Sequence, residues 1–176
     1  MRALLLKNKI CGLFKRIKII NRQYGCCRLL NLSYYFELKK RIKLNEGFAQ
    51  NSYKDQLGFL TIGYGHLIKK NEKHLIHKKS SKKFLDTLFE QDFLQAVSDF
   101  NHKYKKNKYS KSTKEVIIEM IFQLGVVGQK KFIKMNKHIN NKSFFMAALE
   151  MKKSLWYKQT PKRVDLLIKH LLSYDR

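Results

Sequence analysis

The sequence is poor in acidic residues, and this scarcity indicates which kinds of molecule the protein can bind. Its 176 residues include 13 Asp and Glu against 38 Lys and Arg, which gives a formal net charge of +25. At low salt such a chain is attracted to polyanions, and nucleic acid, anionic membranes and the bacterial envelope are the candidates. The basic excess is nearly all lysine, which matches base edges less well than the arginine fork does.

Cysteine is also scarce. Cys11, Cys26 and Cys27 all lie within the first 27 residues, and the rest of the chain has none. An odd number with one adjacent pair predicts neither a disulfide framework nor a metal site. A chain otherwise free of cysteine suits a reducing cytoplasm.

Long apolar runs are absent as well. The apolar positions of residues 1–35 are interrupted by lysine or arginine, and this segment holds eight basic residues and no acid. No run is long enough to cross a bilayer or to form a cleavable signal peptide. We expect a basic N-terminal extension, either disordered or lying on a membrane as a cationic helix.

The remaining sequence has the composition of a folded domain, with 44% hydrophobic and 12% aromatic residues. Apolar residues at three-to-four spacing predict helices over 34–44 and 84–100 and throughout the second half. β-branched and aromatic residues predict a strand over 59–64. The only proline, Pro161, fits the first turn of a last helix. The predicted fold class is α+β and helix-dominated, with a small N-terminal lobe containing a short antiparallel sheet, a long connecting helix and an all-helical C-terminal lobe.

Three helix starts are predicted from polar residues. Ser80 or Ser81 precedes the long helix, Ser112 with Glu115 three residues later has the spacing of a capping box, and Asn141 precedes a further apolar helix.

Two carboxylates lie nine residues apart in the segment 45–67. Glu46 follows a helical pattern that Gly47 can end, where partial burial would keep the carboxyl protonated. Asp55 falls in the turn-rich segment 51–58, which is more open to water. Cleavage of a glycosidic bond needs one acid and one ionised carboxylate, and the two residues can fill these roles. Two acids alone are weak evidence, because most charged residues are solvated surface.

Two further side chains of this segment suit such a site. Thr61 offers a hydroxyl that can orient a water molecule beside Asp55. His66 could shuttle protons, although a hydrogen-bonded structural histidine is the favoured interpretation.

Several short motifs stand in a fixed order along the chain. They are Glu46-Gly47, Tyr53-Lys54-Asp55, Gly58, Thr61-Ile62-Gly63-Tyr64-Gly65-His66, Phe89-Glu90-Gln91-Asp92, Met120-Ile121-Phe122-Gln123-Leu124-Gly125 and the run Trp156 to Arg163. Together they resemble the phage-type lysozymes of glycoside hydrolase family 24, in particular the T-even phage endolysins, over roughly residues 36–175. The resemblance implies a catalytic domain over 36–176, with lobes of about 36–79 and 80–176.

The resemblance also implies roles for individual residues. Glu46 would be the proton donor, Asp55 the second catalytic carboxylate and Thr61 the residue beside the attacking water in an inverting hydrolysis. The cleft residues would be Leu67, Phe122 and Gln123, and the supporting residues Arg163, paired with the glutamate, and His66. At Asn45, Met135 and Glu150 the sequence departs from the pattern of the T-even enzymes. These departures leave the catalytic residues intact but put the contacts to the peptide side and to the distal sugars in doubt.

The function expected from the resemblance is that of a muramidase. It would cleave the β-1,4 bond between N-acetylmuramic acid and N-acetylglucosamine in peptidoglycan, as a monomer, without cofactor or metal. If a phage encodes the chain, the enzyme would wait in the host cytoplasm for a holin-type membrane partner to release it, and a bacterial or host-acquired copy could be defensive. The alternatives are a non-catalytic cationic wall-binding protein and a basic nucleic-acid-binding protein.

Overall fold

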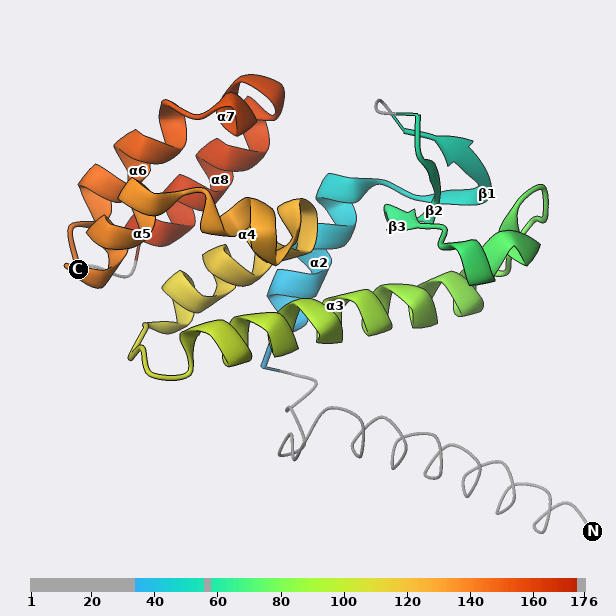
Figure 1. Ribbon diagram of the computed structural model, residues 1–176, viewed down its shortest axis with the longest axis horizontal. Coiled ribbons are helices and arrows are strands. Elements are labelled where there is room, and N and C mark those ends of the chain that lie inside the picture. Colours follow the sequence, from blue (N-terminus) through green and yellow to red (C-terminus); the bar gives the residue numbers. More distant parts are fainter. Residues whose placement is uncertain (1–33, 56–57, 174–176) are drawn as a thin grey trace, which may run out of the picture. The chain divides into compact units, whose positions relative to one another are not determined.

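The computed structural model describes residues 34–55 and 58–173, which are the coloured parts of Figure 1. Backbone contacts group the described residues from Glu37 onward into one compact unit. The predicted extension over residues 1–35 lies outside the described residues except for its last two positions, and all three cysteines lie outside them. Those predictions therefore stay predictions.

A small sheet follows directly on helix α2, Phe36–Glu46. Its strands run antiparallel in the order β1-β2-β3, with bounds Ala49–Lys54, Leu60–Gly63 and His66–Leu67. Thr61 lies opposite Tyr53 on one side and opposite Leu67 on the other. Thr61 is thus at the centre of the sheet, between residues of both edge strands.

Helix α3, Lys82–Tyr104, links the sheet to the later helices. It packs on β2, β3 and α4, and Figure 1 shows it running beneath both parts of the domain. Ser81 rather than Ser80 caps it, because the Ser81 hydroxyl accepts a hydrogen bond from the Phe84 N–H at 3.2 Å. Before it, the polar segment forms a short 3-10 helix, η1, Lys70–Leu75.

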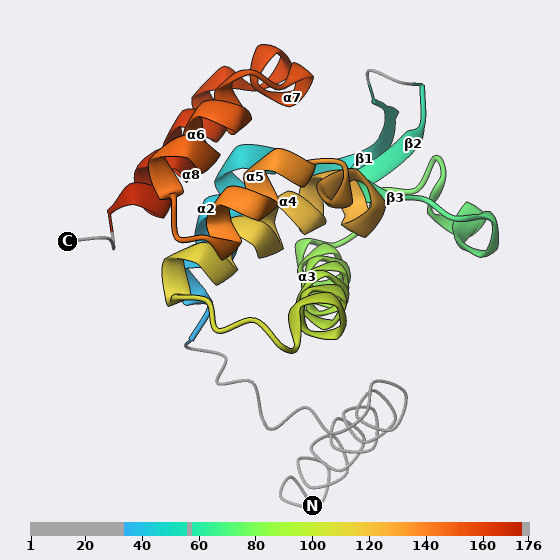
Figure 2. The same cartoon turned by 60° about the vertical axis from the view of Figure 1, so that its left-hand side comes forward.

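The rest of the described chain is helical. Its elements are α4 (Lys111–Lys130), α5 (Ile133–Asn140), α6 (Phe144–Lys152), α7 (Leu155–Gln159) and α8 (Pro161–Leu172). Pro161 opens α8, as predicted. Figure 2 shows α6, α7 and α8 grouped apart from the sheet, with α2 and α4 between them. The predicted α+β, helix-dominated class is confirmed.

Apolar burial explains how these elements hold together. Ile62, Leu75, Leu85 and Leu88 form one buried cluster that joins the sheet, η1 and α3. On the helical side the buried side chains come from every helix; they include Val116, Ile117, Met120, Met135, Met151, Val164 and Leu167. Within the described residues, no helix combines the length and the apolar character needed to span a membrane.

Two predicted helix starts are wrong. Ser110 caps α4, since its hydroxyl accepts a hydrogen bond from the Thr113 N–H at 3.3 Å, so Ser112 lies inside the helix and is buried. Asn141 ends α5 instead of starting α6, which begins after Ser143. In both cases the apolar stripe predicts where the helix lies. Several neighbouring polar residues could cap its N-terminus, so the sequence does not indicate which of them does.

Candidate active site

Glu46 is the last residue of α2, and the buried side chains of Leu38 and Ile42 anchor that helix. Gly47 ends it with a φ of +72°, a conformation that residues with a Cβ adopt at a cost. The Glu46 side chain is 19% exposed, and its Oε1 accepts a hydrogen bond from Arg163 Nη2 at 2.8 Å. Its other oxygen faces Gly65, where a Cβ would come within 3.2 Å.

The surroundings of Glu46 raise the pKa of its carboxyl above the ordinary value of 4.5. Burial is the largest cause; the Arg163 guanidinium opposes it, and the negative charge of Glu119 adds to it. A carboxyl whose pKa is raised in this way keeps its proton to higher pH and can donate it to a leaving group. The geometry therefore suits Glu46 to the role of general acid.

Asp55 directly follows β1 and opens the turn that leads to β2. Its backbone N–H donates to the Phe59 carbonyl at 2.9 Å, and its Oδ1 accepts from the Phe59 N–H at 2.8 Å. The Gly58 N–H closes the turn by donating to the Asp55 carbonyl at 3.0 Å. The predicted turn is shorter than 51–58, because residues 51–54 belong to β1.

Tyr53 is affected by the charges of both carboxylates. Its pKa is raised by burial first and then by the negative charges of both Glu46 and Asp55, so both carboxylates lie within electrostatic reach of its hydroxyl. Across the strand pair, Thr61 is buried and its hydroxyl donates to the Phe59 carbonyl at 3.2 Å. Tyr53 and Thr61 are cross-strand partners and Asp55 directly follows β1, so the β1–β2 hairpin brings these three residues close together.

His66 has a structural position. Its Nδ1 lies 2.7 Å from Asp92 Oδ2 on α3, and its Nε2 lies 3.2 Å from Glu72 Oε2 on η1. The hydrogen bond to Asp92 is the first cause of a raised pKa for the imidazole, and Glu72 contributes in the same direction. With both nitrogens engaged, the ring ties β3 to its two neighbours.

A hollow of about 260 Å³ lies between β3, α3 and α4. Its lining comprises Gly65, His66, Leu67, Lys69, Asp92, Gln95, Ala96, Asp99, Ile121, Phe122 and Gly125. Leu67 is 51% exposed, and the Phe122 ring packs on Phe89 with 5.5 Å between centroids. We call this hollow the cleft. Gly65 connects it to Glu46, because this glycine lines the cleft and a Cβ placed on it would come within 3.2 Å of Glu46 Oε2.

Gln123 is the predicted cleft residue that the structure keeps apart from the hollow. Its Oε1 accepts a hydrogen bond from Trp156 Nε1 at 2.9 Å, which joins α4 to α7. Just beyond it, Gly125 bends α4 with a φ of +69°. The side chain is therefore held as a link between helices.

A buried group of charges behind Glu46 was not predicted. Glu119 is 1% exposed and accepts hydrogen bonds from Arg41 Nε at 2.8 Å and from Asn45 Nδ2 at 3.0 Å. Glu115, one turn earlier, lies 2.8 Å from His170 Nε2. Two acids four residues apart in the otherwise apolar stretch 115–121 were the available signal, because a carboxylate on a buried face needs a partner.

No site for a metal ion is evident in the part of the chain that the structure describes. Within residues 34–55 and 58–173, no three His, Cys, Asp or Glu side chains are grouped so that they could hold one.

Comparison with known proteins agrees with this geometry. The family model described as phage lysozyme matches residues 43–170, which contain Glu46, Asp55 and Arg163. Two proteins of Dictyostelium discoideum, probable T4-type lysozymes 1 and 2, are each 32% identical to this chain over 154 residues, covering 74% of this chain and 91% of the relative. A match over this much of the sequence establishes the assignment: the chain belongs to the phage lysozyme family and is a glycoside hydrolase of the muramidase type.

Proposed function

We propose that this enzyme hydrolyses the β-1,4 bond between N-acetylmuramic acid and N-acetylglucosamine in bacterial peptidoglycan. The observation that carries the proposal is the position of Glu46, a mostly buried carboxyl with a raised pKa whose Oε2 faces Gly65, a glycine that lines the cleft. A protonated acid next to a hollow of sugar-binding character is what glycosidic cleavage requires.

Glu46 donates its proton to the leaving glycosidic oxygen. Arg163 holds the carboxyl by one oxygen and stabilises the carboxylate that forms once the proton has left. Gly65 leaves room for the sugar to approach the other oxygen, because it has no side chain there.

Asp55 and Thr61 act on the water side of the reaction. The ionised Asp55 carboxylate takes a proton from water and stabilises the positive charge that develops on the sugar, while the Thr61 hydroxyl orients the same water. The hydrogen bonds of Asp55 support these roles, since they anchor the residue at its backbone and at Oδ1. Attack by that water on the face opposite the leaving group gives inversion, which requires carboxyl groups about 6.5–9.5 Å apart.

The cleft binds the glycan on its apolar and polar faces. Leu67 and Phe122 provide apolar surface for sugar rings, and Gln95 and Asp99 provide hydrogen-bonding groups. We propose a monomeric enzyme that lyses bacterial cells and, if phage-encoded, waits in the host cytoplasm until a holin-type partner opens the membrane.

The test identifies which sugar forms the new reducing ends of the cleaved glycan. Purified peptidoglycan is digested with the wild-type protein and with Glu46→Gln, and the products are reduced with borohydride and analysed by mass spectrometry. Reduced N-acetylmuramic acid ends from the wild type alone support the proposal. Reduced N-acetylglucosamine ends would refute the bond assignment, and binding without new ends would leave a cationic wall-binding protein.

A further inference from the structure

A second hollow, of about 360 Å³, lies on the helical part of the enzyme. We call it the distal cavity. It is formed by the loop between α3 and α4, by the first turn of α4 and by the segment that joins α5 to α6. Its lining consists of Asn107, Lys108, Tyr109, Ser110, Thr113, Ile139, Asn140, Lys142 and Phe144.

Three polar side chains connect the two walls of the distal cavity. Asn107 Nδ2 donates to Asn140 Oδ1 at 3.0 Å and to the Tyr109 hydroxyl at 2.9 Å, and that hydroxyl donates to Asn140 Oδ1 at 2.6 Å. Burial is the main reason why the pKa of Tyr109 is raised to about 12, so the hydroxyl keeps its proton. The cavity is therefore held open by its own hydrogen bonds, which lowers the entropic cost of binding.

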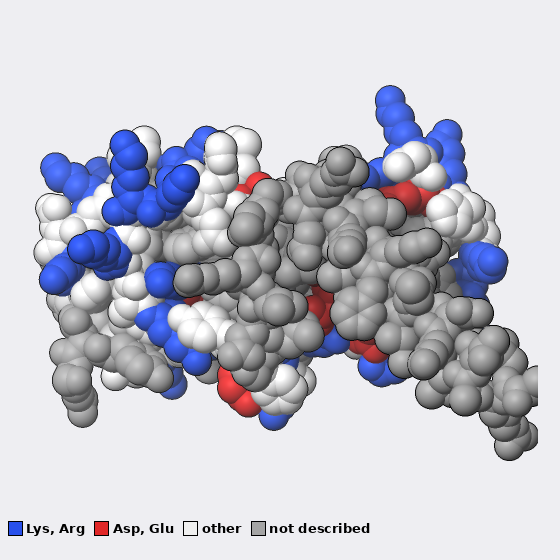
Figure 3. Space-filling view, turned by 90° about the horizontal axis from the view of Figure 1, so that it is seen from below, with Lys and Arg blue, Asp and Glu red and all other residues white. Residues whose placement is uncertain are grey.

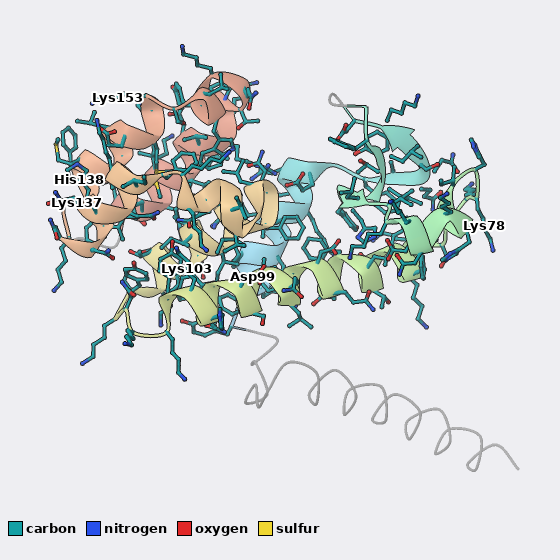
Figure 4. The ribbon with its side chains drawn as sticks, viewed as in Figure 1. Lys78, Asp99, Lys103, Lys137, His138 and Lys153 are labelled. Carbon is teal, nitrogen blue, oxygen red and sulfur yellow. The ribbon has the colours of Figure 1, made fainter. Side chains whose placement is uncertain are left out.

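The charge around the distal cavity has one sign. Residues 100–114 hold six lysines and no acid, and the only acids in residues 115–149 are Glu115 and Glu119, which are buried. Lys108 and Lys142 are exposed, and neither forms an ion pair with any described residue. Figure 3 shows Lys and Arg crowding this end of the molecule, and Figure 4 shows Lys103, Lys137 and His138 in the same half.

Two helix starts add to this positive potential. Ser110 caps α4 and Thr113 lies in its first turn, while Phe144 is the first residue of α6. Helix N-termini carry partial positive charge, which supplements the two lysines without being a site alone; Asn140, the last residue of α5, brings one helix C-terminus of opposite sign to the same cavity.

The distal cavity is separate from the cleft. Thr113 lines the first and Phe122 and Gly125 line the second, and all three lie on α4. Nine to twelve residues of helix at 1.5 Å each put roughly 14–18 Å between them. A polymer bound at one site would therefore leave the other open to the glycan.

We infer that the distal cavity binds a phosphate-bearing polyol polymer of the bacterial wall. The choice of a wall polymer rests on the proposed function. Lysines and helix starts would take the phosphates, while the amides of Asn107 and Asn140 and the hydroxyls beside them would take the polyol oxygens. A single-stranded nucleic acid fits less well, because Tyr104 is buried, Tyr109 is half-buried and residues 100–149 contain no arginine.

The sharpest variant is Asn140→Asp, which adds one negative charge inside the cavity and keeps an oxygen to accept from Asn107 and Tyr109. Its matched control is Asn71→Asp, which makes the same charge change at an exposed position of η1. Binding of soluble poly(glycerol phosphate) is measured by titration calorimetry at fixed salt. Asn140→Asp should weaken it about tenfold, whereas Asn71→Asp should change it by less than about twofold.

A second pair of variants guards against a folding defect. Lys108→Gln with Lys142→Gln should weaken binding more than Lys78→Gln with Lys79→Gln, which removes the same charge from the opposite end of the molecule, where Figure 4 labels Lys78. Equal losses in both pairs would overturn the inference, since net charge alone would then explain binding. Tighter binding of a single-stranded oligonucleotide with the same sensitivity to Asn140→Asp would also overturn it.

Polymer binding at the distal cavity and glycan cleavage are tested by separate measurements. New reducing ends are measured on walls stripped of phosphate polymer, where Asn140→Asp should cleave at the wild-type rate. Loss of cleavage by the wild type would refute the proposed function, and the calorimetry would still decide whether the distal cavity binds the polymer.

Discussion

The two candidate catalytic carboxylates are held by regions of opposite character. Glu46 ends a helix whose surroundings are charged and buried: Arg163 binds it directly, and Glu119, Arg41 and Asn45 lie behind it. Asp55 stands at the start of a hairpin turn, and the contacts that fix it come from the backbone of Phe59 and Gly58. The surroundings of Glu46 set the proton affinity of its carboxyl, whereas the hairpin turn sets the position of Asp55.

The comparison shows why a sequence can carry two acids with different tasks. Burial at the packed end of a helix raises the pKa of Glu46 despite the adjacent guanidinium. A hairpin turn places a side chain next to solvent, where a carboxylate can reach water. Changes to the first region should therefore alter stability and pH dependence, and changes to the second mainly the rate.

The largest effect is expected when either carboxyl is neutralised. Glu46→Gln and Asp55→Asn should each reduce the rate of peptidoglycan cleavage by about 10²–10⁴-fold, the usual contribution of an acid or base. Glu37→Gln, an exposed acid on the same helix as Glu46, should retain the rate. Release of reducing ends measures all three, and an active Glu46→Gln would exclude Glu46 as the acid.

A loss of stability is expected when the charges behind Glu46 are broken. Arg41→Met leaves Glu119 buried without its cation, which should cost about 3–5 kcal/mol in the free energy of unfolding. Chemical denaturation measures it, with Lys40→Met on the exposed face of α2 as the control. Adding Glu119→Gln to Arg41→Met should restore part of the loss. A single variant as stable as the wild type would contradict the pairing.

A smaller, pH-dependent effect is expected on the sheet side. His66 has a raised pKa, so its contribution to stability is fully present below the unfolded value of about 6.5 and is lost as the pH rises through the folded value. His66→Asn should therefore cost about 1.5–3 kcal/mol in acidic solution and less in alkaline solution. Thermal unfolding across pH tests this, and a cost independent of pH would mean that packing alone matters.

The smallest effect concerns the pH profile of the reaction. The charge of Glu119 contributes to the raised pKa of Glu46, so Glu119→Gln should lower that pKa. Because cleavage needs protonated Glu46, the alkaline limb of the rate profile should move to lower pH. Glu150→Gln on α6 is the control, and equal profiles for Glu119→Gln and the wild type would mean that the two carboxyls are not coupled.

Local signals predicted much of this arrangement. An apolar helical stripe followed by Gly47 predicted the helix end that carries Glu46, and the β-branched run over 59–64 predicted the strand beside Asp55. The fold class followed from the same periodicities. Each of these features depends on residues close together in the chain, which is why sequence patterns report them.

Those sequence patterns did not predict contacts between segments that are distant in the chain. Glu119 pairs with Arg41 across 78 positions and Glu115 with His170 across 55, so nothing near either acid indicates which residue is its partner. Gln123 shows the same limit: its sequence position suggested the cleft, whereas Trp156, 33 residues later, holds its side chain. The roles of the site residues stay predictions until the variants above are measured.

The contact between Arg163 and Glu46 spans 117 positions, so it has a consequence for synthesis. While the chain leaves the ribosome, both carboxylates and the whole sheet are available long before α8. The acid can be fixed in place only after Pro161–Leu172 has been made and packed. A product truncated before α8 would contain both candidate carboxylates and lack the Arg163 hydrogen bond to Glu46, so we expect it to be inactive.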